Sequence, residues 1–240
     1  MSTLHPYSIF PLGDSALTIE FGNSISRQLN ARVLDLYHRI HSSDLPFSDL
    51  APAYGSLTVF YDLALVHSKK PEDKTAFEVM AMLIEALAGE SGSPPELTTR
   101  SIEVPVCYEE EFGPDAHRLA TEKGITVEEL IRLHSGTSYR VYMLGFLPGF
   151  AYMGDVDERI ATPRHAQPRS HVHAGSVGIA GRQTGIYPLH SPGGWQIIGR
   201  TPIQLFNVTG TEPAFFRPGD EVKFYSITRH EFARYQNRTA

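Results

Sequence analysis

Residues 174–202 read AGSVGIAGRQTGIYPLHSPGGWQIIGRTP. This stretch decides the fold, because two β-like runs in it, Ser176 to Ala180 and Trp195 to Gly199, are separated by turns rich in glycine and proline. Comparable runs are predicted on both sides, at Tyr139 to Leu144, Ile203 to Val208 and Glu221 to Ile227. Short strands at this spacing favour a closed β-barrel over an open sheet.

Upstream of these strands, one further strand and two helices are predicted. Ser101 to Tyr108 is a predicted strand, and Pro114 to Lys123 is a short helix that Gly124 ends. A second helix begins at the capping box Thr-Val-Glu-Glu, residues 126–129, and runs to about Ser135.

The sequence changes character near residue 93. Before it, apolar residues three and four apart predict a helix from about Ser24 to His41, and a second helix with Pro71 in its first turn and Gly89 at its end. Strands are predicted at Tyr7 to Ile9, Leu17 to Phe21 and Ser56 to Tyr61. The segment GESGSPPE at 89–96 has the composition of a linker. We therefore predict an α+β chain, with an α/β sandwich over residues 1–93 and a β-barrel domain carrying the site over residues 94–240.

Charge limits the classes of function. The 240 residues carry a formal net charge of −6, yet the stretch from Arg159 to Thr211 holds five arginines and no Asp or Glu. A glycine-rich, cationic segment in an acidic protein is suited to an anionic ligand, although solvated surface arginines would give the same pattern. The segment has no lysine, which argues against nucleic acid.

The cellular compartment follows from what the sequence does not contain. No apolar run is long enough to span a bilayer and the N-terminus does not resemble a secretion signal, so no membrane partner is expected. The single cysteine, Cys107, alternates with valines in a strand-like run and is predicted to pack in the core. These features together predict a cytoplasmic protein.

Two loops concentrate polar side chains between glycines. Arg182 lies in the first loop and Arg200 in the second, and we predict that both bind an anionic substrate and contribute to catalysis, because a planar guanidinium matches a carboxylate or phosphate. The residues around them are predicted to bind substrate: Gln183, Thr184, Tyr187, Ser191, Gly193, Gly194 and Trp195.

A third group lies upstream, where His134, Arg140 and Tyr142 flank the run LGFLPGFAY at 144–152. The run is suited either to a pocket wall or to a barrel corner packed with aromatic rings. Arg140 and Tyr142 are accordingly predicted substrate contacts. His134 falls at a helix end, where it is either a general base or a histidine satisfied by local hydrogen bonds.

No standard catalytic or nucleotide-binding motif occurs in the chain. His171 and His173 would point to the same side of a strand and could bind a metal with His165. The sequence places no carboxylate or thiolate near them to complete or orient the set, so no metal site is expected.

The longest motifs resemble the family of the 5-oxoprolinase B subunit, also described as allophanate hydrolase subunit 1 and as a sporulation kinase inhibitor. The motifs are LGFLPGFAY at 144–152, ATPR at 161–164, AGSVGIAGRQTGIYP at 174–188 and SPGGWQIIGRTP at 191–202. Shorter matches extend the resemblance over essentially the whole chain.

The resemblance implies a ferredoxin-like α/β domain followed by a cyclophilin-like β-barrel. It also implies that the chain acts with the C subunit, its closest partner, and the A subunit in the ATP-dependent opening of 5-oxoproline to L-glutamate. ATP would be a co-substrate, and no tightly bound cofactor is expected. In this hypothesis Arg182 and Arg200, with the backbone N–H groups of Gly193 and Gly194, hold the carboxylate or the transferred phosphoryl group of a small anionic cyclic amide.

Two departures from the family pattern and two other functions stay open. His173 stands where relatives usually have proline, and Glu109 to Glu111 stand where relatives often have glycines. The alternatives are an inhibitor of a sensor histidine kinase, which would hold a partner segment in an apolar groove, and a component of a urea- or allophanate-metabolising amidohydrolase.

Overall fold

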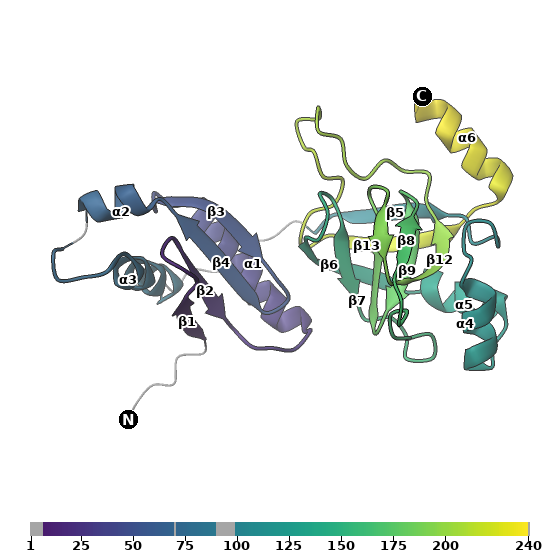
Figure 1. Cartoon of the computed structure of the whole chain (residues 1–240), viewed down its shortest axis with the longest axis horizontal. Coiled ribbons are helices and arrows are strands. Elements are labelled where there is room, and N and C mark those ends of the chain that lie inside the picture. Colours follow the sequence, from purple (N-terminus) through teal and green to yellow (C-terminus); the bar gives the residue numbers. More distant parts are fainter. Residues whose placement is uncertain (1–6, 70, 90–98, 240) are drawn as a thin grey trace. The chain divides into compact units, whose positions relative to one another are not determined.

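The computed structural model describes residues 7–69, 71–89 and 99–239 and divides the chain into two compact units, Met1–Thr98 and Thr99–Ala240 (Figure 1). Most of the predicted linker at 89–96, with the predicted domain boundary at 93, lies outside the described residues. Each unit has a hydrophobic core of its own, and the two cores share no residue.

The first unit is an antiparallel sheet covered by helices. Its strands, in the spatial order β1-β2-β4-β3, are β1 (Ser8–Pro11), β2 (Ala16–Glu20), β4 (Ser56–Tyr61) and β3 (Phe47–Pro52), and its helices are α1 (Arg27–His41), α2 (Leu63–Lys69) and α3 (Ala76–Gly89). Helix α1 begins where Ser26 Oγ accepts a hydrogen bond from the Leu29 amide at 3.5 Å. Val33 of α1 and Met80 of α3 are fully buried against Leu17 and Val59 of the sheet.

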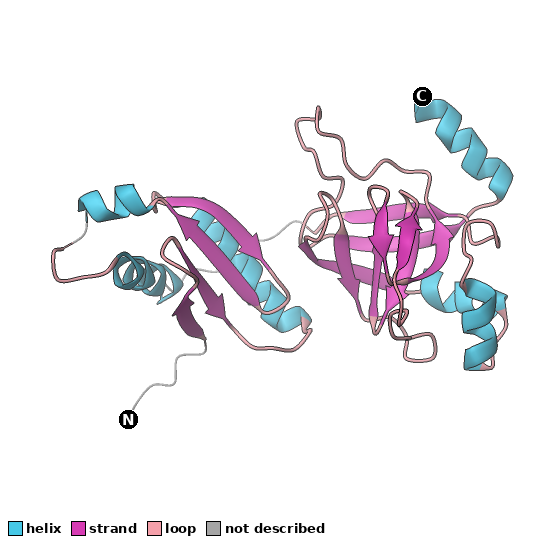
Figure 2. Ribbon diagram, in the orientation of Figure 1, coloured by secondary structure: helices cyan, strands magenta, loops and turns pink. Residues whose placement is uncertain are grey.

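The second unit is built on a seven-stranded sheet that curls into a nearly closed barrel (Figure 2). The spatial order is β12-β9-β10-β7-β6-β13-β5, with β5 (Ser101–Val106), β6 (Ser138–Leu144), β7 (Ala151–Gly154), β9 (Ser176–Ala180), β10 (Gln183–Ile186), β12 (Gln196–Arg200) and β13 (Glu221–Ser226). Its two outer strands meet where the amide of Cys107 donates to the carbonyl of Arg200, and the reverse, each at 2.9 Å. A two-stranded ribbon, β8 (Arg169–Val172) with β11 (Ser191–Gly193), forms a separate small sheet.

Three helices complete the second unit: α4 (Ala116–Lys123), α5 (Val127–Ser135) and α6 (Arg229–Thr239). Gly124 ends α4 with a φ of 66°, a left-handed conformation that favours glycine. Thr126 Oγ1 accepts the Glu129 amide at 3.2 Å at the start of α5, which confirms half of the predicted capping box. Cys107 is fully buried, as its predicted packing role requires.

These findings support a mixed α/β chain with a separate antiparallel sheet and a nearly closed barrel, while the ferredoxin-like and cyclophilin-like labels stay predictions. The predicted strand at Ile203 to Val208 is wrong, because only an isolated bridge from Phe206 to Ala214 forms there. The helix predicted from Pro71 begins at Ala76 instead. None of the helices in the described ranges is long and apolar enough to cross a membrane.

Candidate functional site

A pocket of about 140 Å³ opens beside the end of strand β12 in the second unit. It is smaller than the ~300–1,000 Å³ clefts that hold drug-sized ligands, so it suits a small metabolite or one end of a larger one. Two larger pockets of the chain have no arginine in their lining. The residues that line the pocket at β12 are Glu111, Phe112, Pro114, Arg169, His171, Val172, His173, Ser176, Ile197 and Arg200.

Arg200 is the cation best placed to act in this pocket. Its Nε donates to the carbonyl oxygen of Ala174 at 2.9 Å, which fixes the direction of the guanidinium. Among the residues that the structure describes, no carboxylate forms an ion pair with it. Burial lowers the pKa of Arg200, against the opposing influence of Glu111. A partly desolvated guanidinium without a carboxylate partner is a favourable place for an anion.

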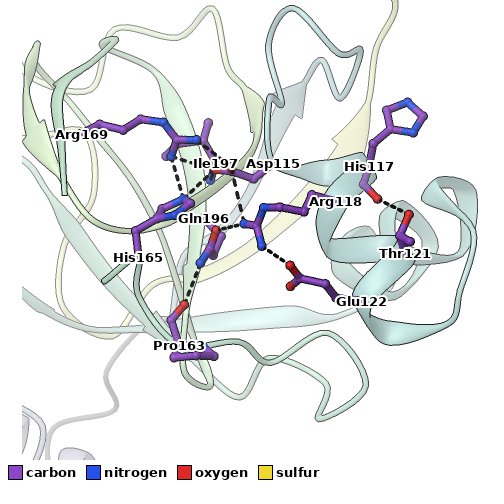
Figure 3. Close-up of polar contacts among 10 residues, drawn as sticks. All are labelled: Asp115, His117, Arg118, Thr121, Glu122, Pro163, His165, Arg169, Gln196 and Ile197. Carbon is purple, nitrogen blue, oxygen red and sulfur yellow. Dashed lines mark hydrogen bonds and ion pairs between the residues drawn. The ribbon is translucent and has the colours of Figure 1, made fainter. Parts of the chain in front are cut away.

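The wall of the pocket is held by a buried carboxylate, Asp115 (Figure 3). Arg169 donates to both oxygens of Asp115, at 2.6 and 2.9 Å. The same carboxylate accepts the amide of Ile197 at 2.7 Å and lies 3.2 Å from His165 Nε2. Strands β8 and β12 are therefore tied to the start of helix α4 through one side chain, which is only 4% exposed.

The charge of Asp115 is maintained by its hydrogen bonds. Burial alone would raise the pKa of this carboxyl, but the hydrogen bonds from Arg169, the Ile197 amide and His165 outweigh burial and lower it. Arg169 is consequently paired with a carboxylate within the chain. Arg200 forms no such ion pair among the described residues, where its guanidinium contacts the Ala174 carbonyl and the Phe232 ring. The two arginines of the pocket thus differ in role, and only Arg200 has charge to offer a ligand.

The structure does not bring the two predicted arginines together. Arg200 pairs with Ser176 at one end of β9, whereas Arg182 follows Ala180 at the other end. Those ends are four residue steps apart along an extended strand, a distance of about 13 Å. Arg182 is exposed and forms an ion pair with Glu158 at 2.5 Å.

His134 lies inside the barrel core and has no exposed surface. Its Nδ1 is 2.8 Å from the Tyr108 hydroxyl and its Nε2 is 2.9 Å from Thr184 Oγ1. Burial lowers the pKa of His134 to about 3, which keeps the ring neutral. Of the two interpretations that the sequence left open, this arrangement favours a satisfied core histidine over a general base.

Several predicted substrate contacts belong to an aromatic cluster. The Phe150 ring lies 5.3 Å from Tyr187 and 5.3 Å from Trp195, with near-perpendicular planes in both pairs. Gly193 permits this packing, because a Cβ there would collide with the Tyr187 ring. The run at 144–152 is therefore a barrel corner packed with aromatic rings.

The remaining predicted contacts are spread over the second unit. Tyr142 is buried and donates to Asp155 Oδ2 at 3.0 Å, and Arg140 lies 3.7 Å from Glu221. Gln183 begins strand β10, and Gly194 accepts the His165 amide at 2.7 Å. Ser191 begins β11, and its buried Oγ has no hydrogen-bond partner among the described residues. None of these residues lines the Arg200 pocket.

Sequence reasoning missed Asp115 and Arg169, which position the pocket. The sequence held one signal for Arg169, the alternation of side chains along β8. Val172 is buried, and Arg169, His171 and His173 fall on the opposite side of the strand. The pairing of Asp115 with Arg169 joins residues 54 apart, a distance that local patterns do not bridge.

Comparison with known proteins gives consistent matches along the chain. The family model described as carboxyltransferase domain, subdomain C and D, matches residues 7–216. The B subunit of 5-oxoprolinase from Bacillus subtilis (strain 168) is 43% identical over 235 residues, which cover 97% of this chain and 98% of the relative. The B subunit of 5-oxoprolinase from Escherichia coli O157:H7 is 37% identical over 214 residues, 89% of this chain and 93% of the relative.

A solved structure shows the same fold within a longer chain. The crystal structure of TTHA0988 matches with a TM-score of 0.74 and 33% sequence identity. The match covers 88% of this chain but only 39% of TTHA0988. The two curated relatives are thus matched over nearly their whole length, and the longer protein over less than half of its length.

Proposed function

The chain belongs to the carboxyltransferase subdomain C and D family and, within it, to the 5-oxoprolinase B-subunit proteins, and on this premise we propose that it is one subunit of an ATP-dependent 5-oxoprolinase. The complex would hydrolyse 5-oxo-L-proline to L-glutamate. The A and C subunits of that enzyme are the proposed partners, with the C subunit in direct contact.

One observation supports the site of this proposal: the Arg200 guanidinium has no carboxylate partner among the described residues and borders a small pocket. The proposed substrate is a cyclic amide with one carboxylate. A guanidinium fixed by the Ala174 carbonyl would bind that carboxylate through charge-assisted hydrogen bonds. This contact would orient the ring so that its amide faces the partner subunit.

The chemistry explains why ATP is needed. A five-membered lactam is a poor electrophile, so we propose that its amide oxygen first accepts the γ-phosphoryl group of ATP, which leaves ADP. One water then adds to the activated carbon and the C–N bond breaks, which gives γ-glutamyl phosphate. A second water hydrolyses this acyl phosphate to glutamate and inorganic phosphate. Because the chain has no nucleotide-binding motif, the proposed ATP site is shared with a partner subunit.

Of the two arginines that the sequence singled out, Arg200 is the proposed substrate-binding cation, and Arg182 has a different position. It lies beyond the far end of β9 and pairs with Glu158, which gives it no access to the same pocket. If Arg182 acts in catalysis, it would do so at a second surface, against the phosphoryl group or a partner subunit.

The test is formation of glutamate from 5-oxoproline and ATP by this chain co-purified with the A and C subunits, each omitted in turn. We expect activity only from the complete set, and none from the purified chain alone. A well-formed complex could instead be inactive on 5-oxoproline and active on an allophanate- or urea-type amide. That result would show that the second amide, and not 5-oxoproline, is the substrate. Failure to form any complex would favour the kinase-inhibitor function.

Arg200→Gln should reduce turnover of the assembled complex by about 100-fold or more, because one charged contact to the substrate is lost. The matched control is Arg132→Gln, an exposed arginine of α5 paired with Glu129. Turnover by Arg182→Gln is measured in parallel and shows whether Arg182 contributes to catalysis. Full activity of Arg200→Gln in a complex of normal composition would refute the assignment of the pocket.

A further inference from the structure

Three histidines gather at the edge of the Arg200 pocket. His171 lies on strand β8, His173 follows that strand, and His190 precedes β11. Their potential ligand nitrogens all lie within 4.8 Å of one another, and all three side chains are exposed. The His171 and His190 rings stack with centroids 5.1 Å apart, and His173 meets His171 edge-on at 4.9 Å.

The two-stranded ribbon of β8 and β11 explains why these residues meet. Ser191 pairs with Val172 in the antiparallel register of β11 and β8, so one step further along places His190 opposite His173. Only Val172 separates His171 from His173, and this spacing of two positions puts both histidines on one side of the extended chain. The backbone is anchored nearby, because Arg169 of the same strand is held by Asp115.

These imidazoles have no competing role within the described ranges. No hydrogen bond or ion pair joins their ring nitrogens to another described residue. His165, which the sequence suggested as the third member, is instead committed to Asp115 and Arg169. The third nitrogen comes from His190, a residue of the loop between β10 and β11 that sequence spacing did not suggest.

We propose that His171, His173 and His190 form a binding site for a divalent transition-metal ion of the Zn²⁺ class. Three neutral imidazoles are a ligand set that Zn²⁺ accepts, with a fourth position open to water or a ligand. Zinc–nitrogen bonds of about 2.0–2.1 Å require the three nitrogens to move closer together. Exposed side chains can make that movement by small rotations about their own bonds.

The open position of such an ion would face the pocket, because His171 and His173 also line it. The positive charge of Arg200 opposes a cation there, whereas Glu111 in the lining favours one. An anion shared between the metal and Arg200 would offset the repulsion. The site is independent of the proposed function, since it rests on the positions of three side chains and not on the reaction.

The test uses the full chain, purified without a polyhistidine tag, stripped with a chelator and titrated with Zn²⁺ by calorimetry. We expect one ion per chain. His173→Gln and His190→Gln should each weaken Zn²⁺ binding by at least about tenfold, since each removes one of three ligands. The matched control is His117→Gln on α4, which should bind as the unaltered chain does.

Co²⁺ provides a second readout that does not depend on affinity. We expect a visible absorption band of a low-coordinate Co²⁺ site in the unaltered chain and its loss in His173→Gln. Fluorescence of Trp195 verifies that each variant is folded. Absence of Zn²⁺ binding, or equal binding by all the variants, would overturn the proposal, and neither result affects the glutamate assay.

Discussion

His134 is a titratable group placed where its charged form cannot be accommodated. Both ring nitrogens are engaged by hydroxyl groups, from Tyr108 on one side and Thr184 on the other. The Phe224 ring stacks on it with centroids 4.7 Å apart. A proton added to this ring would have to displace a hydrogen-bonded arrangement in a dry core, so protonation and unfolding are coupled.

This coupling predicts how stability depends on pH. Burial lowers the pKa of folded His134 to about 3, whereas the ordinary value is 6.5. The free energy of unfolding therefore keeps its full value above pH 6.5 and decreases as the pH falls below 6.5. The reason is that the unfolded chain then binds a proton at His134 that the folded chain does not bind. Between about pH 7.5 and about pH 5.5 this group should lower the free energy of unfolding by about 1.4 kcal/mol.

The measurement is urea unfolding followed by fluorescence of Trp195, the single tryptophan, which lies in the second unit. His134→Gln keeps a polar side chain but does not titrate, so its unfolding free energy should vary less between the two pH values. An identical pH dependence in the variant and the unaltered chain would show that His134 is not the group responsible.

At the scale of elements, strand β8 is positioned by a contact outside its own ladder. It is four residues long, and among the described strands it pairs only with the three-residue strand β11. The salt bridge from Arg169 to Asp115 ties it to the start of α4, and the Ile197 amide ties β12 to the same carboxylate. The pocket wall and the histidine group therefore depend on one buried carboxylate.

Asp115→Asn should lower the free energy of unfolding of the second unit by about 3 kcal/mol, because the change leaves Arg169 without its anionic partner. Glu122→Gln, which removes an exposed partner of Arg118, should leave stability close to that of the unaltered chain. Urea unfolding of both variants, read by Trp195 fluorescence, checks the difference. Equal stability of the two variants would mean that Asp115 does not hold the wall.

Regular elements with local signals were predictable, and elements that depend on distant partners were not. Strands β4 and β9 match the predicted bounds, since each is an apolar run between turns. Strand β8, RSHV, has no such run and exists because β11 pairs with it. The opposite error occurs at 203–208, where buried Leu205 and its neighbours have the composition of a strand without a ladder partner.

The candidate site was predictable to the same extent. Arg200 was singled out because it ends a glycine-rich motif, directly after Gly199, and the structure places it in the lining of a pocket. Its separation from Arg182 depends on strand register, which the sequence of either loop does not contain. Asp115 gave no signal, because its hydrogen-bond partners come from two distant segments, residues 165–169 and strand β12.

At the scale of the whole molecule, the two units have separate cores, so the second should fold without the first. A chain of residues 99–240 retains the barrel core and Trp195. We expect it to remain in solution and to unfold cooperatively, with a urea midpoint for Trp195 fluorescence close to that of the full chain. A shortened chain that aggregates or lacks a cooperative transition would show that the barrel needs residues 1–98.

The strand order of the barrel also has a consequence for its synthesis on the ribosome. Strand β13 lies between β6 and β5, and it is the last strand among the described residues, whereas β5 is the first described strand of this unit. Apart from the bridge at Cys107, the ladder of β5 is formed with β13. A nascent chain therefore carries β5 with an open edge until residues 221–226 have left the exit tunnel. Closure of the barrel therefore waits for the strand that is made last, and the chain with an open β5 edge is the form in which chaperones would meet this protein.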